Sequence, residues 1–224
     1  ETITTNANKN AQTKLVIAYC TASVHSGGVS TADSNQGPCT VTGKTTTEVL
    51  NEGEKGQLFS TVLSSASVQY ICNLGDVSSF NITLGRSNSS GNFTGVDGGS
   101  GAEGRALAII VQVDSVSFTA PSHSLETDTR LKNFSHTINP TANKGFTVFS
   151  VAEQIQYAGG VGTPKANGSA MDTTLIDSAA SAATKRCAIG VQNETTGASV
   201  TYTLDGNTST NSGGSSTTIG NYAF

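Results

Sequence analysis

The amino-acid sequence predicts an all-β protein built as a β-sandwich, and three observations support this. Turn-forming residues recur about every 8–15 residues, a spacing typical of short sandwich strands. The runs between these turns are rich in Val, Ile and Thr, which β-strands favour. The length of 224 residues fits one large all-β domain. We therefore expect an N-terminal arm over residues 1–12 and a single β-sandwich domain over residues 13–224.

The predicted arm is polar, and its apolar residues are Ile3, Ala7 and Ala11, each four positions from the next. Alone, such a segment buries too little apolar surface to offset its loss of conformational entropy. It is therefore either a frayed terminus or a candidate donor strand that becomes ordered against another surface. The start at Glu1 without Met further suggests an exported protein whose leader was removed.

Two runs are apolar on both faces, residues 15–24 and residues 105–118. The second is the densest apolar run in the chain, and it predicts a central strand that is covered on each side. Residues 58–63 and 67–72 predict a pair of neighbouring strands. Further strands are expected over residues 39–41, 45–50, 80–84, 131–138, 146–152, 187–191 and 200–204.

One short helix is predicted after Met171. Asp172 or Thr173 can cap its first turn, and a Lys-Arg pair stands at the negative end of its dipole. The apolar residues that would share one face of this helix are Leu175, Ile176, Ala179 and Ala183.

Charged residues are unusually scarce, at 12% of the chain. Their net charge of −4 provides no basic surface for phosphate backbones, so we expect no nucleic-acid partner. No apolar segment is long enough to cross a bilayer, so we expect no membrane span. Hydroxyls, amides and any attached glycans must hydrate the surface instead.

The four cysteines are Cys20, Cys39, Cys72 and Cys187. They include no C-x-x-C pair and have no histidines at zinc-site spacing, so we expect neither a metal nor a cofactor, and two disulfides instead. Three pairings are open, and we favour Cys20 with Cys39 and Cys72 with Cys187. Oxidised cysteines would place the protein outside the cytosol. Four buried thiols in a cytosolic protein are the alternative.

Seven asparagines stand in N-x-S/T sequons, where x is not proline. Seven is only a mild excess over chance in a chain this rich in Asn, Ser and Thr, so glycosylation depends on the host. The candidate sites are Asn81, Asn88, Asn92, Asn133, Asn167, Asn193 and Asn207.

Catalysis is not expected. The three histidines, His25, His123 and His136, lie in polar surroundings, and no G-x-S-x-G motif is present. A secreted β-sandwich hydrolase is therefore a lesser alternative, and we predict no catalytic residues.

Edge pairing is the remaining hypothesis. The sequence offers little of the charge or proline that normally protects strand edges. An N-terminal arm that adds as a strand to the next subunit would use backbone hydrogen bonds for affinity and its three apolar residues as plugs. Such a head-to-tail contact does not close on itself and generates a filament.

Two segments resemble filament subunits that assemble by donor-strand exchange. SVQYICNLGDVSSFNITLG, residues 67–85, looks like a segment of spore-coat-U-type chaperone–usher pilins, and GTPKANGSAMDTTLI, residues 162–176, is similar to the region before their last strand. The four-cysteine, Ser/Thr/Asn-rich composition equally resembles archaeal thread subunits. The resemblance implies an immunoglobulin-like sandwich that lacks a strand, completed by a neighbour's arm.

The leading hypothesis is therefore a structural subunit of an extracellular, cell-surface filament. Its partners would be identical subunits arranged head-to-tail, and glycans could modify its surface. Such a pilus-like filament would serve adhesion or biofilm formation. The main alternative is a secreted or virion-surface fibre or binding module.

Overall fold

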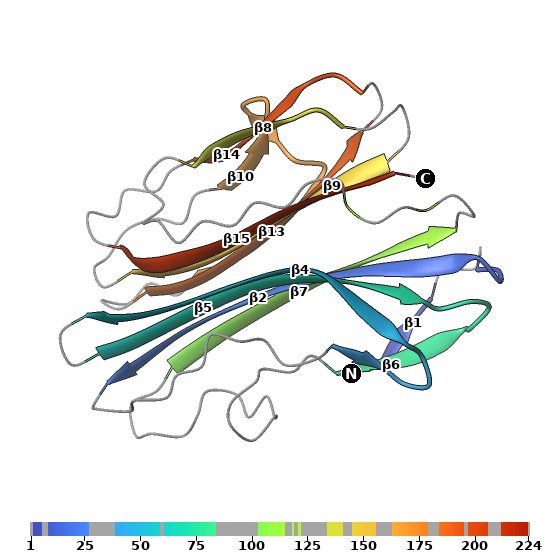
Figure 1. Ribbon diagram of the computed structural model, residues 1–224, viewed down its shortest axis with the longest axis horizontal. Coiled ribbons are helices and arrows are strands. Elements are labelled where there is room, and N and C mark those ends of the chain that lie inside the picture. Colours follow the sequence, from blue (N-terminus) through green and yellow to red (C-terminus); the bar gives the residue numbers. More distant parts are fainter. Residues whose placement is uncertain are drawn as a thin grey trace.

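The computed structural model describes the following residues: 2–5, 9–26, 39–58, 61–83, 103–114, 118, 121, 134–140, 145–155, 163–178, 184–194, 197–205 and 212–223. All regular secondary structure within these ranges is β-strand, which confirms the predicted all-β class. The strands form four antiparallel sheets (Figure 1).

The first half of the chain supplies two of these sheets. The larger has the order β4-β5-β2-β7 and the smaller has the order β1-β6-β3. The strands of this first unit are β1 Thr2–Thr4, β2 Thr13–Ser26, β3 Thr40–Val41, β4 Thr46–Leu58, β5 Thr61–Asn73, β6 Ser79–Thr83 and β7 Glu103–Asp114.

The second half supplies the other two sheets, ordered β12-β13-β9-β15 and β11-β10-β14-β8. The strands of this second unit are β8 Ser135–Ile138, β9 Gly145–Ile155, β10 Thr163–Ala166, β11 Ser169–Ala170, β12 Thr173–Ser178, β13 Thr184–Glu194, β14 Val200–Asp205 and β15 Ser212–Ala223.

The two units have the same topology. In each large sheet the second strand of the unit is an inner strand that pairs with the last strand of the unit: β2 with β7, and β9 with β15. On its other side, β2 pairs with β5 and β9 pairs with β13. In each small sheet the first strand pairs with the strand before the last: β1 with β6, and β8 with β14. Only the short strand β11 has no counterpart among the described strands of the first unit. The described chain is thus a structural duplication.

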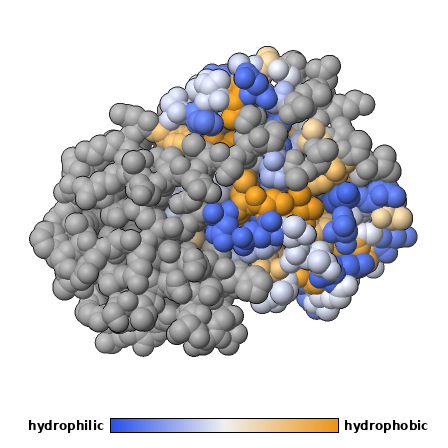
Figure 2. Space-filling view, viewed as in Figure 1, coloured by the Kyte–Doolittle hydropathy of each residue, from blue (hydrophilic) through white to orange (hydrophobic). Residues whose placement is uncertain are grey.

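The four sheets stack as layers, with the two large sheets in the middle (Figure 1). Strand alternation explains this arrangement, because β2 turns Leu15 and Ile17 to one face and Val16 and Ala18 to the other. One core lies between the large sheets, and one lies beneath each small sheet. In the view of Figure 2, apolar residues gather between hydrophilic outer layers of the described part.

Several expectations need correction. The described strands form four sheets rather than the two layers of one sandwich, because the two units pack through their large sheets. The run at 105–118 is not a central strand, since β7 lies at the edge of its sheet and β2 occupies the interior. Residues 61–73 form the single strand β5, which pairs with β4 and β2, so the predicted pair at 58–63 and 67–72 was wrong.

The predicted helix was wrong in its described part. Residues 173–178 form strand β12, which pairs along β13 from Thr173↔Val191 to Ser178↔Arg186. Residues 179–183 lie outside the described residues. Leu175 and Ile176 are both largely exposed, which is possible because β12 is the edge of its sheet. Pairing with β13 therefore overrides the local helical pattern.

Candidate assembly site at the first strand

Strand β1 forms one edge of the small sheet of the first unit. It pairs with β6 through three cross-strand partners: Thr2↔Asn81, Ile3↔Phe80 and Thr4↔Ser79. Because cross-strand partners share a face, Ile3 and Phe80 point toward the large sheet, while Thr4 and Ser79 point to solvent. Residues 2–4 of the predicted arm therefore form a strand, which in the single chain pairs with the same molecule.

Ile3 is the one expected plug that packs against a core. Its partly buried side chain joins the cluster that contains Phe80, Ile82 and Leu15. Ala11 is exposed in the turn before β2, and Ala7 lies outside the described residues. The described arm thus has a single apolar contact with the fold.

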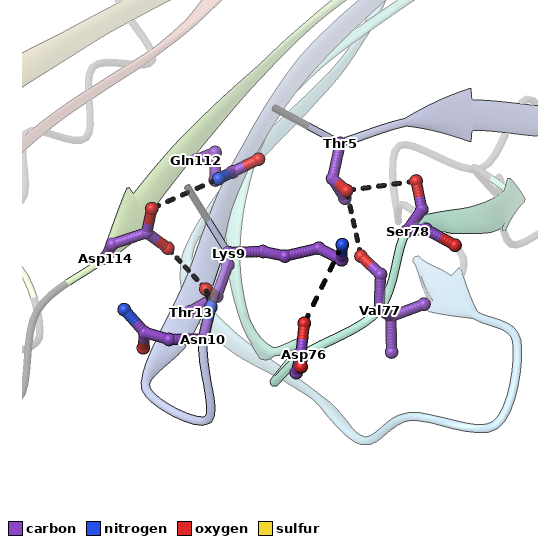
Figure 3. Close-up of polar contacts among 9 residues, drawn as sticks. All are labelled: Thr5, Lys9, Asn10, Thr13, Asp76, Val77, Ser78, Gln112 and Asp114. Atoms are coloured by element: carbon purple, nitrogen blue, oxygen red, sulfur yellow. Dashed lines mark hydrogen bonds and ion pairs between the residues drawn. The ribbon is translucent and has the colours of Figure 1, made fainter. Parts of the chain in front are cut away.

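In the described part of the arm, Thr5 and Lys9 make polar contacts with residues 76–78 (Figure 3). The Thr5 hydroxyl donates to the carbonyl oxygens of Val77, at 2.9 Å, and Ser78, at 3.0 Å. Lys9 Nζ lies 3.8 Å from Asp76 Oδ1, and the Asp76 side chain is 69% exposed. An ion pair so exposed contributes little, about 0–1 kcal/mol.

The end of the arm is fixed much more firmly than its beginning. The buried Thr13 hydroxyl accepts a hydrogen bond from Asn10 N, at 2.7 Å, and donates to Asp114 Oδ1 (Figure 3). Leu74 N and Gly75 N both donate to the Thr13 carbonyl oxygen. Several hydrogen bonds therefore hold the first residue of β2 in place, and β1 precedes this fixed residue in the chain.

The second unit provides an internal comparison for β1. Its counterpart β8 pairs with β14 over four residues, from Ser135↔Thr203 to Ile138↔Val200. Ile138 is fully buried, and Phe134, the residue before β8, is also buried. The second unit thus holds its first strand with two deep apolar side chains, whereas the first unit holds β1 with one half-buried isoleucine.

The chain was compared with protein-family models, curated proteins and solved structures. None of these comparisons gave a match. Its function is therefore inferred from its own geometry.

The four cysteines are present as thiols, and all are buried. Cys20 and Cys187 belong to the core between the large sheets, whereas Cys39 and Cys72 belong to the core beneath the first small sheet. This grouping differs from the expected pairing, in which each disulfide would join cysteines from two different cores. Strand alternation causes the difference, since Cys20 and Cys72 point to opposite faces of the same sheet.

Three of the seven sequon asparagines lie in the described residues, and all three are exposed. Asn81 is on β6, Asn193 is on β13, and Asn167 is in the β10–β11 turn with a positive φ of 49°. The Asn167 side-chain oxygen also accepts a hydrogen bond from Thr201 N, at 2.9 Å. The others, Asn88, Asn92, Asn133 and Asn207, lie outside the described residues.

The described part includes the side chain of one of the three histidines. His136 lies on β8, while the side chain of His25 and the whole of His123 are outside the described residues. Within the described ranges no three His, Cys, Asp or Glu side chains are grouped as metal ligands. No described helix could cross a membrane.

A polar hollow of about 230 Å³ lies beside the β10–β11 turn. Its lining includes Asn167, Gln192 and Glu194. The Glu194 carboxylate is buried and already accepts hydrogen bonds from Thr147 Oγ1, at 2.9 Å, and from the Tyr202 hydroxyl. The Glu194 carboxylate thus forms hydrogen bonds with two residues inside the second unit.

Proposed function

We propose that this protein is a structural subunit of an extracellular, pilus-like filament in which β1 of one copy pairs with β6 of the next. The observation on which the proposal depends is the weak attachment of β1: a three-residue strand with one half-buried plug, followed by an ion pair from Lys9 to the exposed Asp76 carboxylate. The isolated chain closes this edge with its own strand. In the filament, a second copy's β1 takes the same place.

Exchange of β1 between copies costs little in contacts. The same cross-strand pairs, Thr2↔Asn81 to Thr4↔Ser79, and the same Ile3 plug form in either arrangement. Residues 5–12, once extended, reach at most about 28 Å from the start of β2, which is enough to place β1 on a neighbouring molecule. Local concentration of subunits then decides which arrangement prevails, as in domain swapping.

The direction of exchange determines the assembly. Each copy gives β1 from one place and receives a β1 at another, so the contact is head-to-tail and does not close on itself. Backbone hydrogen bonds to β6 provide the affinity, and the Ile3 site provides the register. Repetition of this contact gives a filament, consistent with a role in adhesion or biofilm formation.

The sheet order supports an immunoglobulin-like origin for each unit. In an immunoglobulin constant domain the seven strands form the sheets ABED and CFG. With β1–β7 lettered A–G, the sheets here are DEBG and AFC, so the first and last strands have exchanged sheets. The first strand consequently occupies the place beside strand F that a donor strand would fill in a filament subunit.

A cross-linking experiment tests where β1 pairs. Thr4 and Ser79 are exposed cross-strand partners, so cysteines at the two positions can form a disulfide. Subunits with Thr4→Cys are mixed with subunits with Ser79→Cys, assembled, mildly oxidised and run on non-reducing gels. We expect covalent dimers, because each bond would join two chains.

The matched control replaces Ser79→Cys with Thr83→Cys. Thr83 is on the same strand and is also exposed, but its partner is Thr40 rather than a residue of β1. This mixture should give no dimers. If the doubly substituted chain, Thr4→Cys with Ser79→Cys, forms only intrachain bonds at assembly concentration, the exchange proposal is wrong.

Electron microscopy of negatively stained protein provides the assembly readout. The full chain should form filaments, and a chain that lacks residues 1–12 should remain soluble and monomeric. If the truncated chain still forms filaments, the arm is not the donor strand. A closed trimer or a monomer of the full chain would favour the fibre or binding module instead.

A further inference from the structure

Cys39 and Cys72 share one buried core from two different strands of the first unit. Cys39 immediately precedes β3, and Cys72 is on β5; neither side chain is exposed. Thr46 links them, because it is the cross-strand partner of Cys72 and its hydroxyl donates to the Cys39 carbonyl oxygen. Thr46 therefore contacts the backbone of Cys39 and is also paired with Cys72 across the strands.

The electrostatics agree with this closeness. Burial and, to a smaller extent, the nearby Cys72 raise the pKa of the Cys39 thiol to about 12. Burial also raises the pKa of Cys72, against a lowering influence from Lys44. Such an influence agrees with the two thiols lying in the same buried core.

We propose that Cys39 and Cys72 form a disulfide in the exported protein. Each thiol gives up one proton and one electron, an S–S bond forms, and the two electrons and two protons reduce a low-molecular-weight disulfide to two thiols. The exchange passes through a mixed disulfide at one of the two cysteines. It links the start of β3 to β5 and so fixes the small sheet, onto which β1 docks, to the large one.

The proposal also specifies when the bond forms. The nucleophile in thiol–disulfide exchange is the thiolate, and burial suppresses it at both positions near neutral pH. Oxidation therefore takes place while the chain folds, before the core closes. Once folded, the reduced protein should react slowly with oxidants and alkylating reagents.

Peptide mapping of the full chain tests the pairing. The protein is refolded with reduced and oxidised glutathione, denatured, alkylated without reductant, and digested with trypsin and an enzyme that cleaves before aspartate. Cleavage at Asp33 and Lys44 isolates Cys39, and cleavage at Lys55 and Asp76 isolates Cys72, so the four cysteines fall on four peptides. We expect one linked species that contains Cys39 and Cys72 and separates on reduction.

Any other outcome at these two residues overturns the proposal. Alkylation of both Cys39 and Cys72 in the unreduced sample, or linkage of Cys39 to Cys20 or of Cys72 to Cys187, would show that the bond does not form. A second measurement uses thermal melting of the folded protein. Reductant should lower the Tm of the wild-type protein and of Cys20→Ala, but should leave the Tm of Cys39→Ala unchanged.

This result is separable from filament formation. The disulfide is mapped on the refolded monomer, and β1 exchange is read from cross-links between chains. A mapped Cys39–Cys72 bond in a protein that never forms filaments would leave this inference intact while ending the proposed function.

Discussion

At the scale of single residues, the contact between the two units depends on polar side chains that are fully buried. Gln69 on β5 reaches across to the second unit, where its side-chain nitrogen donates to Val148 O, at 3.1 Å, and to Thr218 Oγ1, at 3.0 Å. Its side-chain oxygen accepts from the Tyr222 hydroxyl, at 2.7 Å. Because each of these bonds is formed away from water, loss of one partner leaves another group buried and unsatisfied.

Replacement of Gln69→Leu should therefore destabilise the protein although it adds apolar surface. The substitution leaves the Tyr222 hydroxyl without its acceptor and takes one of two hydrogen-bond partners from the Thr218 hydroxyl, at a cost of about 1–3 kcal/mol of unfolding free energy. Denaturant unfolding measures the loss. Tyr222→Phe is the matched variant, and the double variant should lose less than the sum of the two single losses. Strict additivity would show that the two side chains do not interact.

The sequence could not identify this contact. In residues 67–70 polar and apolar side chains alternate, and such alternation ordinarily indicates one face toward solvent. Ser67 and Gln69 instead face a second unit, where Ser67 Oγ contacts Ser150 O at 3.0 Å. Nothing local distinguishes a polar face that meets water from one that meets another sheet.

At the scale of elements, one glycine shows how closely the strands of the second unit pack. A Cβ atom at Gly145, the first residue of β9, would lie 2.3 Å from the backbone oxygen of Tyr222 on β15. A Cβ atom at Gly190 on β13 would lie equally close to Met171 Sδ, an atom near the end of a flexible side chain. The added Cβ atom would be equally close to its neighbour at both positions, but the neighbour is backbone at Gly145 and a flexible side chain at Gly190.

Gly145→Ala should consequently be the more damaging substitution. Its neighbour is paired backbone, which cannot rotate away, so we expect a loss of about 1–3 kcal/mol, as for other overpacked sites. Gly190→Ala should lose less, because Met171 can adopt another rotamer. The midpoints of urea unfolding compare the two variants. Equal losses, or a larger loss at Gly190, would contradict this account.

Strong apolar runs predicted strands well, and polar runs predicted them poorly. The runs near 15–24, 80–84 and 146–152 coincide with β2, β6 and β9. By contrast, β15 was missed because its sequence, SGGSSTTIGNYA, is dominated by Gly, Ser and Thr. Its full-length pairing with β9 makes it a strand, and pairing between distant segments cannot be read from local composition.

At the scale of the whole molecule, the all-β class was predictable but the duplication was not. The two units have the same strand order, which arises from pairing between distant segments that local composition does not reveal. Ile3 packs against a core of its own chain, and its role as a donor-strand residue stays a prediction. The weaker attachment of β1 is seen by comparing it with β8, and that comparison needs the strand pairing and burial of the structure.

The cores of this stacked molecule also determine its response to alkali. Of the five tyrosines in the sequence, Tyr19, Tyr70, Tyr202 and Tyr222 are described, and all four are buried. Burial raises the pKa of each above the ordinary phenol value. A hydrogen bond to Glu48 adds to the rise at Tyr70, and one to Glu194 adds to it at Tyr202.

Stability should therefore fall steeply as the pH rises above about 10, the pKa of a tyrosine in an unfolded chain. Above that pH the unfolded chain has lost phenol protons that the folded protein keeps, so the unfolding free energy decreases with pH. The stabilising contribution is fully present below pH 10 and disappears as the pH approaches the raised folded values. Because the cores share the two large sheets, both units should unfold in one transition.

Tyrosinate absorbance and far-ultraviolet circular dichroism, recorded together during alkaline titration, test this expectation. A Tyr157→Phe variant removes the signal of the fifth tyrosine, which lies outside the described residues. In that variant absorbance should appear abruptly and together with loss of the strand signal. A gradual rise in absorbance centred near pH 10 with the strand signal unchanged would mean that these phenols are accessible to water, and that the stacked cores are not closed as described.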